Sequence, residues 1–380
     1  MTVPPQVLSD SPEIRRASAL LTIDLNALAA NWHTCAGLSA ATVETAAVVK
    51  AGGYGVGAGQ AAAALRNAGC ETFFVATIDE GLALRKALGK GPKIHILDGF
   101  LSGTGDEFTH HHLIPVLNSL EQIDAWRADQ QARDTALPSD LHIDTGMARL
   151  GLGADELQAV IDTPELLAGL NTQLILSHLV AAEDPSSPLN AHQLALFEHA
   201  RAHLPAAPAA LANSSALFLP RPYHLDLVRP GVALYGVNPT PGKPNPMAQV
   251  VRLQARILQV RTIDTPTTVG YGATYTAQGV ERIATISAGY ADGYHRSLSN
   301  SGVAYIGPHK APVVGRVSMD LIALNVTDVP EDMCQPGHWV DLIGANNPLD
   351  DVARRAATIG YEILTSLGAR LQRIYVGGTP

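Results

Sequence analysis

The chain has 380 residues, of which 16% are charged, and its formal net charge is −9. A chain of this length exceeds what one hydrophobic core usually organises, so we expect two domains. The acidic balance and the lack of a basic run argue against nucleic acid or an anionic membrane as the main partner, and favour small metabolites.

The amino-terminal residues 1–11 lack a basic start followed by an apolar stretch, and nowhere do eighteen apolar residues follow one another. Cys35, Cys70 and Cys334 are odd in number, widely spaced and free of metal-type spacing. They are typical of reduced thiols. We therefore expect a soluble cytoplasmic protein with no membrane association.

The first chemically informative element is the apolar run that ends at Lys50. Ala47-Val48-Val49 predicts a strand covered on both faces, and a lysine at its carboxyl end can reach a cofactor aldehyde above the sheet. Gly52, Gly53, Gly55 and Gly57 follow, and they would let the backbone approach a phosphate closely. Taken alone, the motif fits a solvent-exposed lysine beside an ordinary turn equally well.

Short apolar runs alternate with Ala/Leu-rich helical stretches over residues 46–229, which is typical of parallel strands joined by crossover helices. Eight such units predict an α/β fold, a (β/α)8 barrel of the TIM type. Barrels place their chemistry at the carboxyl ends of strands, so we expect Lys50, Asp144-Thr145, His178, Asn213-Ser214 and Arg229 on one rim. The predicted strands are Ala46–Lys50, Thr72–Thr77, Lys93–Asp98, Ile114–Asn118, Asp140–Thr145, Leu174–Leu179, Ala209–Asn213 and Leu225–Arg229.

After the proline-rich residues 239–246 the pattern changes to alternating strands, which predicts a separate, smaller, mainly β domain. We expect an amino-terminal arm and first strand in residues 1–24, the barrel in residues 25–240, and the β-rich domain in residues 241–380. Whether the opening strand Ala19–Asp24 pairs with the β-rich domain or with the barrel stays open. The later predictions are strands Val250–Val260, Arg282–Ser287, Val303–Ile306, Val313–Val317 and Trp339–Ile343, and a helix Asp350–Leu367 broken by Gly360.

Five segments in this order resemble the bacterial alanine racemases, pyridoxal-phosphate enzymes of fold type III with a barrel and a β domain. They are Val48-Val49-Lys50-Ala51 with Tyr54-Gly55, residues 144–151 (DTGMARLG), residues 228–236 (VRPGVALYG), residues 271–276 (YGATYT) and residues 289–293 (GYADG). The resemblance spans nearly the whole chain. It implies racemisation of L-alanine and D-alanine with pyridoxal 5'-phosphate, supplying D-alanine for peptidoglycan.

By this resemblance, Lys50 anchors the cofactor and is one of two catalytic bases. Racemisation removes the α-proton from one face of the substrate and returns a proton on the other, so a second base must lie opposite the lysine. The resemblance gives this role to Tyr271 of a partner subunit, which implies a homodimer with shared active sites. A phenol, with a reference pKa near ~10, needs nearby donors or cations to act as a base, and Arg149 and His178 are the candidates.

The resemblance also assigns the groups that would hold the cofactor ring. Arg229 would donate to the pyridine nitrogen, where many pyridoxal enzymes carry a carboxylate. An arginine is always cationic and disfavours ring protonation, which favours clean return of the proton. His178 would support Arg229 or contact the ring, although a hydrogen-bonded core histidine is a simple alternative.

Neutral donors would bind the phosphate, and other side chains the substrate. The resemblance implies Tyr54, Asn213, Ser214, Tyr361 and the backbone of Gly231 and Val232 for the phosphate. Ser214 also fits the N-cap of a helix after Ser215. Arg149 and the Met319 backbone would bind the substrate carboxylate, and Tyr290 with Tyr361 would narrow the entrance to fit alanine. An apolar pocket rejects an added hydroxyl by only roughly 1–3 kcal/mol, so serine is a slow alternative substrate.

The chain departs from the family pattern at three places. Gly52-Gly53 stands where an Asn-Ala or Asp-Ala pair is usual, and Val56 where histidine or leucine is common. His142 occupies the place of a lysine whose carbamate orients the arginine of the motif at residues 144–149. A histidine cannot form that carbamate, so Arg149 would be held by His142 itself, by water or by an anion.

Four other interpretations have to be considered. His110-His111-His112 lack a spaced ligand cluster, so we expect no metal. Gly53, Gly55 and Gly57 after a strand, with Asp79 beyond them, imitate a dinucleotide-binding fingerprint in a doubly wound sheet. A non-enzymatic pyridoxal-phosphate carrier would be a lone barrel, and a decarboxylase can share the two-domain fold. Proton exchange with inversion at alanine separates a racemase from both.

Overall fold

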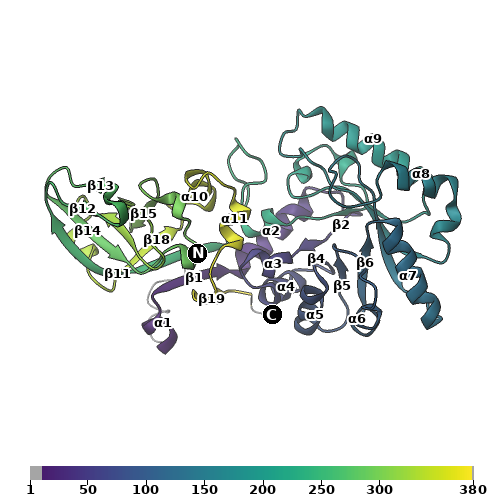
Figure 1. Ribbon diagram of the computed structural model, residues 1–380, viewed down its shortest axis with the longest axis horizontal. Coiled ribbons are helices and arrows are strands. Elements are labelled where there is room, and N and C mark those ends of the chain that lie inside the picture. The colour runs from purple at the N-terminus through teal and green to yellow at the C-terminus, as the bar shows by residue number, and fades with distance from the viewer. Residues whose placement is uncertain (1–10, 379–380) are drawn as a thin grey trace. The chain divides into compact units, whose positions relative to one another are not determined.

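The computed structural model describes residues 11–378 (Figure 1). They pack as two compact units. The barrel unit comprises residues 28–248, and the β unit combines residues 11–27 with residues 249–377.

The barrel unit is built on a parallel sheet whose strand order is β3-β4-β5-β6-β7-β8-β9. On its open side β10 pairs in parallel with β2, which leads directly into β3. The amides of Asp226 and Arg229 donate to the carbonyls of Ala209 and Ala212 and so join β10 to β9. The predicted barrel fold is confirmed. Its strands are β2 (Glu44–Thr45), β3 (Ala47–Val48), β4 (Thr72–Val75), β5 (Lys93–Ile96), β6 (Leu113–Leu117), β7 (Pro138–His142), β8 (Asn171–Leu176), β9 (Ala209–Ala210) and β10 (Leu227–Val228).

Helices follow the barrel strands, and their starts carry ordinary capping signals. Thr77 accepts the Glu80 amide at the start of α5, and Ser119 accepts the Gln122 amide at the start of α7. After β9 and β10 the connections are short 3-10 helices. The helices are α2 (Leu25–Gly37), α3 (Lys50–Tyr54), α4 (Ala58–Asn67), α5 (Ile78–Leu88), α6 (Gly105–His111), α7 (Leu120–Arg133), α8 (Ala154–Asp162), η2 (Pro164–Leu167), α9 (Pro188–His203), η3 (Ala216–Phe218), η4 (Arg221–Tyr223) and η5 (Val232–Tyr235).

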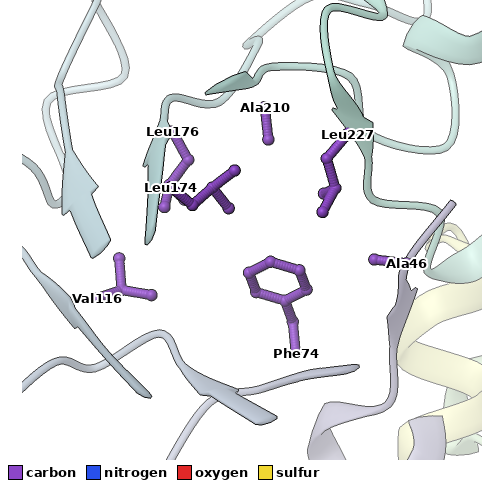
Figure 2. Packing of buried hydrophobic residues seen from close by; sticks show 7 residues of the cluster. All are labelled: Ala46, Phe74, Val116, Leu174, Leu176, Ala210 and Leu227. Carbon is purple, nitrogen blue, oxygen red and sulfur yellow. The ribbon is translucent and has the colours of Figure 1, made fainter. Parts of the chain in front are cut away.

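The barrel interior is a packed apolar core, shown in Figure 2. Side chains from strands around the ring point toward its centre, and Phe74, which is fully buried, occupies the middle of the view. Burying such a side chain contributes roughly 1.5–3 kcal/mol. The interior is therefore filled, and the chemistry is left to the rim. The cluster consists of Ala46, Phe74, Val116, Leu174, Leu176, Ala210 and Leu227.

The β unit is a mainly antiparallel sheet that includes the opening strand of the chain. Its order is β16-β15-β18-β11-β1-β19, and β14 pairs with β11 and β17. Strand β1 runs antiparallel to β11 and parallel to β19. The strands are β1 (Ala19–Asp24), β11 (Val251–Ile263), β12 (Thr268–Val269), β13 (Tyr275–Thr276), β14 (Glu281–Ile286), β15 (Val303–Ile306), β16 (His309–Pro312), β17 (Ile322–Asn325), β18 (Trp339–Ile343) and β19 (Gln372–Val376).

Short helices complete the β unit. Two of them, α10 and α11, cover the region where one interrupted helix was expected. The first ends where Ala357 adopts a left-handed φ of 57°, and Gly360 begins the second rather than breaking it. The helices are α1 (Pro12–Arg16), η6 (Tyr271–Ala273), η7 (Tyr290–Asp292), η8 (Arg296–Leu298), η9 (Glu331–Met333), α10 (Leu349–Arg355) and α11 (Gly360–Thr365).

The predicted strand Val313–Val317 is wrong. Val313 makes only an isolated bridge to Leu324, and Gly315 with φ 74° turns the chain away. The strand lies earlier instead, as β16. Across residues 11–378 no helix combines the length and apolar character needed to cross a membrane.

Candidate active site

Lys50 begins a left-handed turn directly after β3. Ala51, Gly52 and Gly53 have φ values of 53°, 62° and 68°. The Gly53 amide donates to the Val49 carbonyl over 2.9 Å, which fixes the turn. Left-handed backbone costs roughly 1–2 kcal/mol at a residue with a Cβ, so the paired glycines relieve strain at this corner. They explain locally why the chain can place an amine here.

The surroundings of Lys50 favour its neutral form. Burial lowers the pKa of the Lys50 ammonium, and the positive charge of Arg149 lowers it further, while Glu80 and Asp98 oppose the shift. Glu80 also supports the turn, because its carboxylate accepts the Gly52 amide over 3.2 Å. A neutral amine is the form that attacks an aldehyde.

Arg229 follows β10 and is a buried cation whose direct partners are all neutral. Its guanidinium donates to the carbonyls of Ala210 and Ser177 over 3.0 and 2.7 Å, and to His178 Nδ1 over 3.3 Å. The guanidinium carbon lies 5.9 Å from the centre of the Phe74 ring. Burial lowers the pKa of Arg229 to about 10, which still leaves the group charged at neutral pH.

His178 is neutral beside this cation. Burial lowers the pKa of His178 to about 3, and the charge of Arg229 contributes in the same direction. A neutral imidazole can accept the Arg229 hydrogen bond on Nδ1. His178 therefore fixes the direction of the arginine without cancelling its charge.

A second corner of the rim gathers small groups suited to an anion. Ser214 Oγ accepts the amides of Gly231 and Ala233 over 2.9 and 3.3 Å. Gly231 is required by packing, because a Cβ there would lie 2.4 Å from the Tyr54 hydroxyl oxygen. Tyr54 in turn stacks on Tyr235 with ring centroids 4.6 Å apart. Hydroxyls and backbone amides in one place are typical of a phosphate cradle.

Asn213, rather than Ser214, caps the short helix η3. Its side-chain oxygen accepts the Ala216 amide over 3.0 Å. The capping interpretation of Ser214 is therefore wrong, because that hydroxyl is directed to the backbone of Gly231 and Ala233. Val232 begins η5 next to these amides and is buried.

Arg149 is presented by a loop that one carboxylate organises. Asp144 accepts the backbone amides of Gly146 and Met147 on Oδ1, and that of Ala148 on Oδ2, over 2.8–2.9 Å. The Arg149 side chain itself is exposed and forms no hydrogen bond or ion pair within residues 11–378. Its cationic group is thus free to meet a ligand.

His142 does not hold Arg149. Its Nδ1 lies 2.7 Å from the side-chain oxygen of Asn118, which is anchored by bonds to the carbonyls of Leu97 and Val116. Burial lowers the pKa of His142 to about 4, so the ring is neutral at ordinary pH. Of the three predicted ways to hold Arg149, the direct contact with His142 is therefore wrong.

The remaining predicted site residues belong to the β unit, where their side chains reach solvent. The exposed fractions are 74% for Tyr271, 43% for Tyr290, 52% for Met319 and 37% for Tyr361. That they meet the barrel rim remains a prediction.

Three residues near the site escaped the sequence interpretation. Glu80 and Asp98 act on Lys50 through their charges, and Asn118 holds His142. Asp98 and Asn118 end predicted strands, so the rule that barrel chemistry lies at strand ends could have found them. In the described part of the chain no cluster of three or more metal-ligating side chains is present.

Family models for the alanine racemase N-terminal domain and C-terminal domain match residues 23–239 and 250–375. The chain is 49% identical to an alanine racemase of Rhodospirillum rubrum over 95% of its length and 97% of that protein. It is 47% identical to a catabolic alanine racemase of Mesorhizobium japonicum, over 95% of this chain and 94% of that protein.

Solved structures show the same likeness. The alanine racemase of Bartonella henselae, crystallised with covalently bound pyridoxal phosphate, superposes with a TM-score of 0.91 and 44% identity, covering 95% of this chain and all of that one. The closed barrel order contradicts the alternative of a doubly wound dinucleotide-binding sheet.

Proposed function

Because this chain belongs to the alanine racemase family, an isomerase family that uses pyridoxal phosphate, we propose that it interconverts L-alanine and D-alanine by a two-base mechanism. One observation carries the proposal. A lysine with a lowered pKa shares a barrel rim with a buried arginine whose direct partners are all neutral.

The rim residues fit pyridoxal phosphate. Lys50, whose pKa is lowered, offers an amine for the aldehyde, Arg229 a donor for the ring nitrogen, and Ser214, whose oxygen is held by the Gly231 amide, a hydroxyl for the phosphate. The Tyr54 hydroxyl is pressed against Gly231 in the same cradle. The conjugated ring, when bound, withdraws the electron pair left when the substrate Cα–H bond breaks.

The proton transfers fall to two side chains. Lys50 exchanges a proton with the substrate Cα on one face, and Tyr271 does so on the opposite face. The fixed positive charge of Arg229 would disfavour protonation of the ring nitrogen of a bound cofactor, which would favour return of the proton to the substrate Cα. His178 holds Arg229 in this orientation.

We assign Tyr271 to a partner subunit, so that the working unit is a homodimer with two shared sites. Its 74% exposure on η6 supports this proposal, because the phenol is accessible to a second chain. Cytoplasmic synthesis of D-alanine for peptidoglycan is the corresponding role.

The substrate carboxylate binds Arg149 and the backbone amide of Met319 in this proposal. That amide donates no hydrogen bond within residues 11–378, so it is available. Tyr290 and Tyr361 limit the side chain to a methyl group, and serine is turned over slowly.

Complementation tests the shared sites. Lys50→Ala and Tyr271→Phe proteins should each lose at least ~1,000-fold in kcat, because each lacks one of two required bases. Mixed after subunit exchange, they should regain up to about a quarter of wild-type activity, measured as deuterium incorporation into alanine with inversion. Wild-type protein and an unmixed pair are the controls.

Two results would contradict the proposal. Heterodimers that form, as seen with differently tagged subunits, and yet stay inactive would exclude shared sites. Deuterium incorporation by the Tyr271→Phe protein on both faces at the wild-type rate would exclude the tyrosine as a base.

A further inference from the structure

Two adjacent loops of the β unit carry residues of the proposed substrate site. The first, residues 287–293, follows β14 and presents Tyr290. The second, residues 314–321, joins β16 to β17 and presents Met319. The two side chains are 43% and 52% exposed, so their own packing does not hold them in place.

The backbones of the two loops are joined directly. The Tyr290 amide donates to the Ser318 carbonyl over 3.0 Å, and the Ala291 amide to the Met319 carbonyl over 3.1 Å. Gly289 permits the approach, because a Cβ there would lie 2.3 Å from both the Ser318 and the Met319 carbonyl oxygens. A shift of one loop therefore moves the other.

One arginine from a third segment forms hydrogen bonds to both loops. Arg370 makes a two-pronged ion pair with Asp292, through Nε to Oδ1 over 2.6 Å and Nη2 to Oδ2 over 2.9 Å. Its Nη1 donates to Asp320 Oδ1 over 2.7 Å. Nη2 also approaches the Met319 carbonyl at 3.4 Å. All three guanidinium nitrogens are engaged, in a geometry that lysine cannot reproduce.

The inner carboxylate of this network is built into the first loop. The Asp292 side chain is only 6% exposed, and Oδ2 also accepts the Gly289 amide over 2.8 Å. The Asp292 carbonyl accepts the Gly368 amide, which ties the loop to the segment that carries Arg370. A buried carboxylate needs its cation, so Arg370 orders this loop as well as reaching the next one.

We propose that Arg370 is a positioning residue that sets substrate affinity and side-chain selectivity by holding Met319 and Tyr290 at a fixed separation. The inference rests on the proposed function, which places these two residues at the substrate. Arg370 touches no reacting atom. Its role is to keep the Met319 amide and the Tyr290 ring at fixed positions relative to each other. Displacement of either group by about 1 Å can cost much of a binding interaction.

The test compares the purified wild-type holoenzyme with Arg370→Lys, which keeps the charge but loses the fork. Arg354→Lys is the matched control, because Arg354 makes an exposed pair with Asp351 on α10 of the same unit. Asp320→Asn removes the charge of the contact to the second loop and leaves the Asp292 ion pair intact. The measurements are kcat and KM for alanine and serine, amide hydrogen exchange, and cofactor absorbance per subunit.

For Arg370→Lys we expect KM for alanine to rise about tenfold with kcat changed less than ~3-fold, which is the signature of lost positioning in binding. Preference for alanine over serine should fall by about 3–10-fold. Exchange at residues 289–293 and 318–321 should quicken about tenfold. Asp320→Asn should show a smaller shift in the second loop, and Arg354→Lys none.

Unchanged KM and selectivity in Arg370→Lys would overturn the inference. So would faster loop exchange without any kinetic change, since the loops would then be ordered for another reason. A wild-type protein that does not racemise alanine would refute the proposed function instead, and the exchange measurement would still decide whether Arg370 holds the loops.

Discussion

At the scale of single residues, His142 changes the electrostatics of the barrel rim. A neutral imidazole bonded to Asn118 stands where the family resemblance places a carbamylated lysine, and it does not hold Arg149, which was one of the predicted possibilities. The turn organised by Asp144 presents Arg149 instead, through bonds to the backbone alone. Arg149 therefore keeps its full charge for a ligand carboxylate.

The lowered pKa of His142 also predicts how the stability of the protein depends on pH. The pKa of His142 is about 4 in the folded protein and near ~6.5 when unfolded, so the unfolded chain binds more protons between these values. The free energy of unfolding should therefore fall as pH drops from 6.5 to 4. The contribution of His142 is up to about 3 kcal/mol. Urea unfolding at pH 7 and pH 4.5 measures the total loss.

His142→Gln isolates this contribution, because glutamine can still donate to Asn118 but does not titrate. The variant should lose less stability than the wild type over the same interval. His192→Gln, at an exposed position on α9, serves as the control and should follow the wild type. If all three proteins lose stability equally, the imidazole is not the titrating group.

At the scale of elements, the left-handed turn after β3 decides where the lysine amine lies. Gly52 has φ 62°, and nothing lies within 4 Å of a Cβ built there, so only backbone conformation restricts this position. Gly52→Val should lower the free energy of unfolding by roughly 1–2 kcal/mol and reduce the cofactor held at Lys50. Gly52→Asn should be nearly neutral, because asparagine tolerates left-handed backbone.

Thermal unfolding and the ratio of cofactor absorbance to protein measure both variants. Neither side chain meets a neighbour at its Cβ. The difference in stability between the two variants therefore reports the cost of the left-handed φ alone. Equal stability of the two proteins would show that the turn does not need its left-handed form.

The sequence predicted the barrel and most of its rim because these follow from local periodicity and strand ends. Lys50, Asn213, Ser214 and Arg229 follow strands, and a closed parallel sheet brings such positions together. The glycines after Lys50 signalled a turn but not its hand, which depends on hydrogen bonds such as Gly53 to Val49.

Hydrogen-bond partners that are far apart in the sequence could not be predicted from local periodicity. The Asn118 partner of His142 lies on another strand, and the Arg370 network joins three segments with no common periodicity. Strand β16 was missed because the apolar pattern of residues 313–317, directly after it, imitated a strand, although Gly315 turns the chain there.

At the scale of the whole molecule, strand β1 pairs with strands from the last third of the chain. It lies between β11 and β19, and Leu21 at its centre is fully buried. Leu21→Ala should lower the free energy of unfolding by about 2–5 kcal/mol through the cavity that it leaves. Limited proteolysis should then cut residues 249–377, far from the substitution in sequence.

Leu258→Ala, at a half-exposed leucine of β11, is the matched control and should change stability by at most ~0.5 kcal/mol. New cleavage confined to residues near position 21 would show that the β unit does not depend on its opening strand.

The position of β1 also bears on how the protein is made. The ribosome delivers this strand before the barrel, yet both neighbours of β1 in the sheet emerge only after the entire barrel has been translated. At ordinary rates of translation the nascent segment waits on the order of tens of seconds, with its apolar face uncovered. We therefore expect β1 to need protection by chaperones until β11 and β19 have been synthesised.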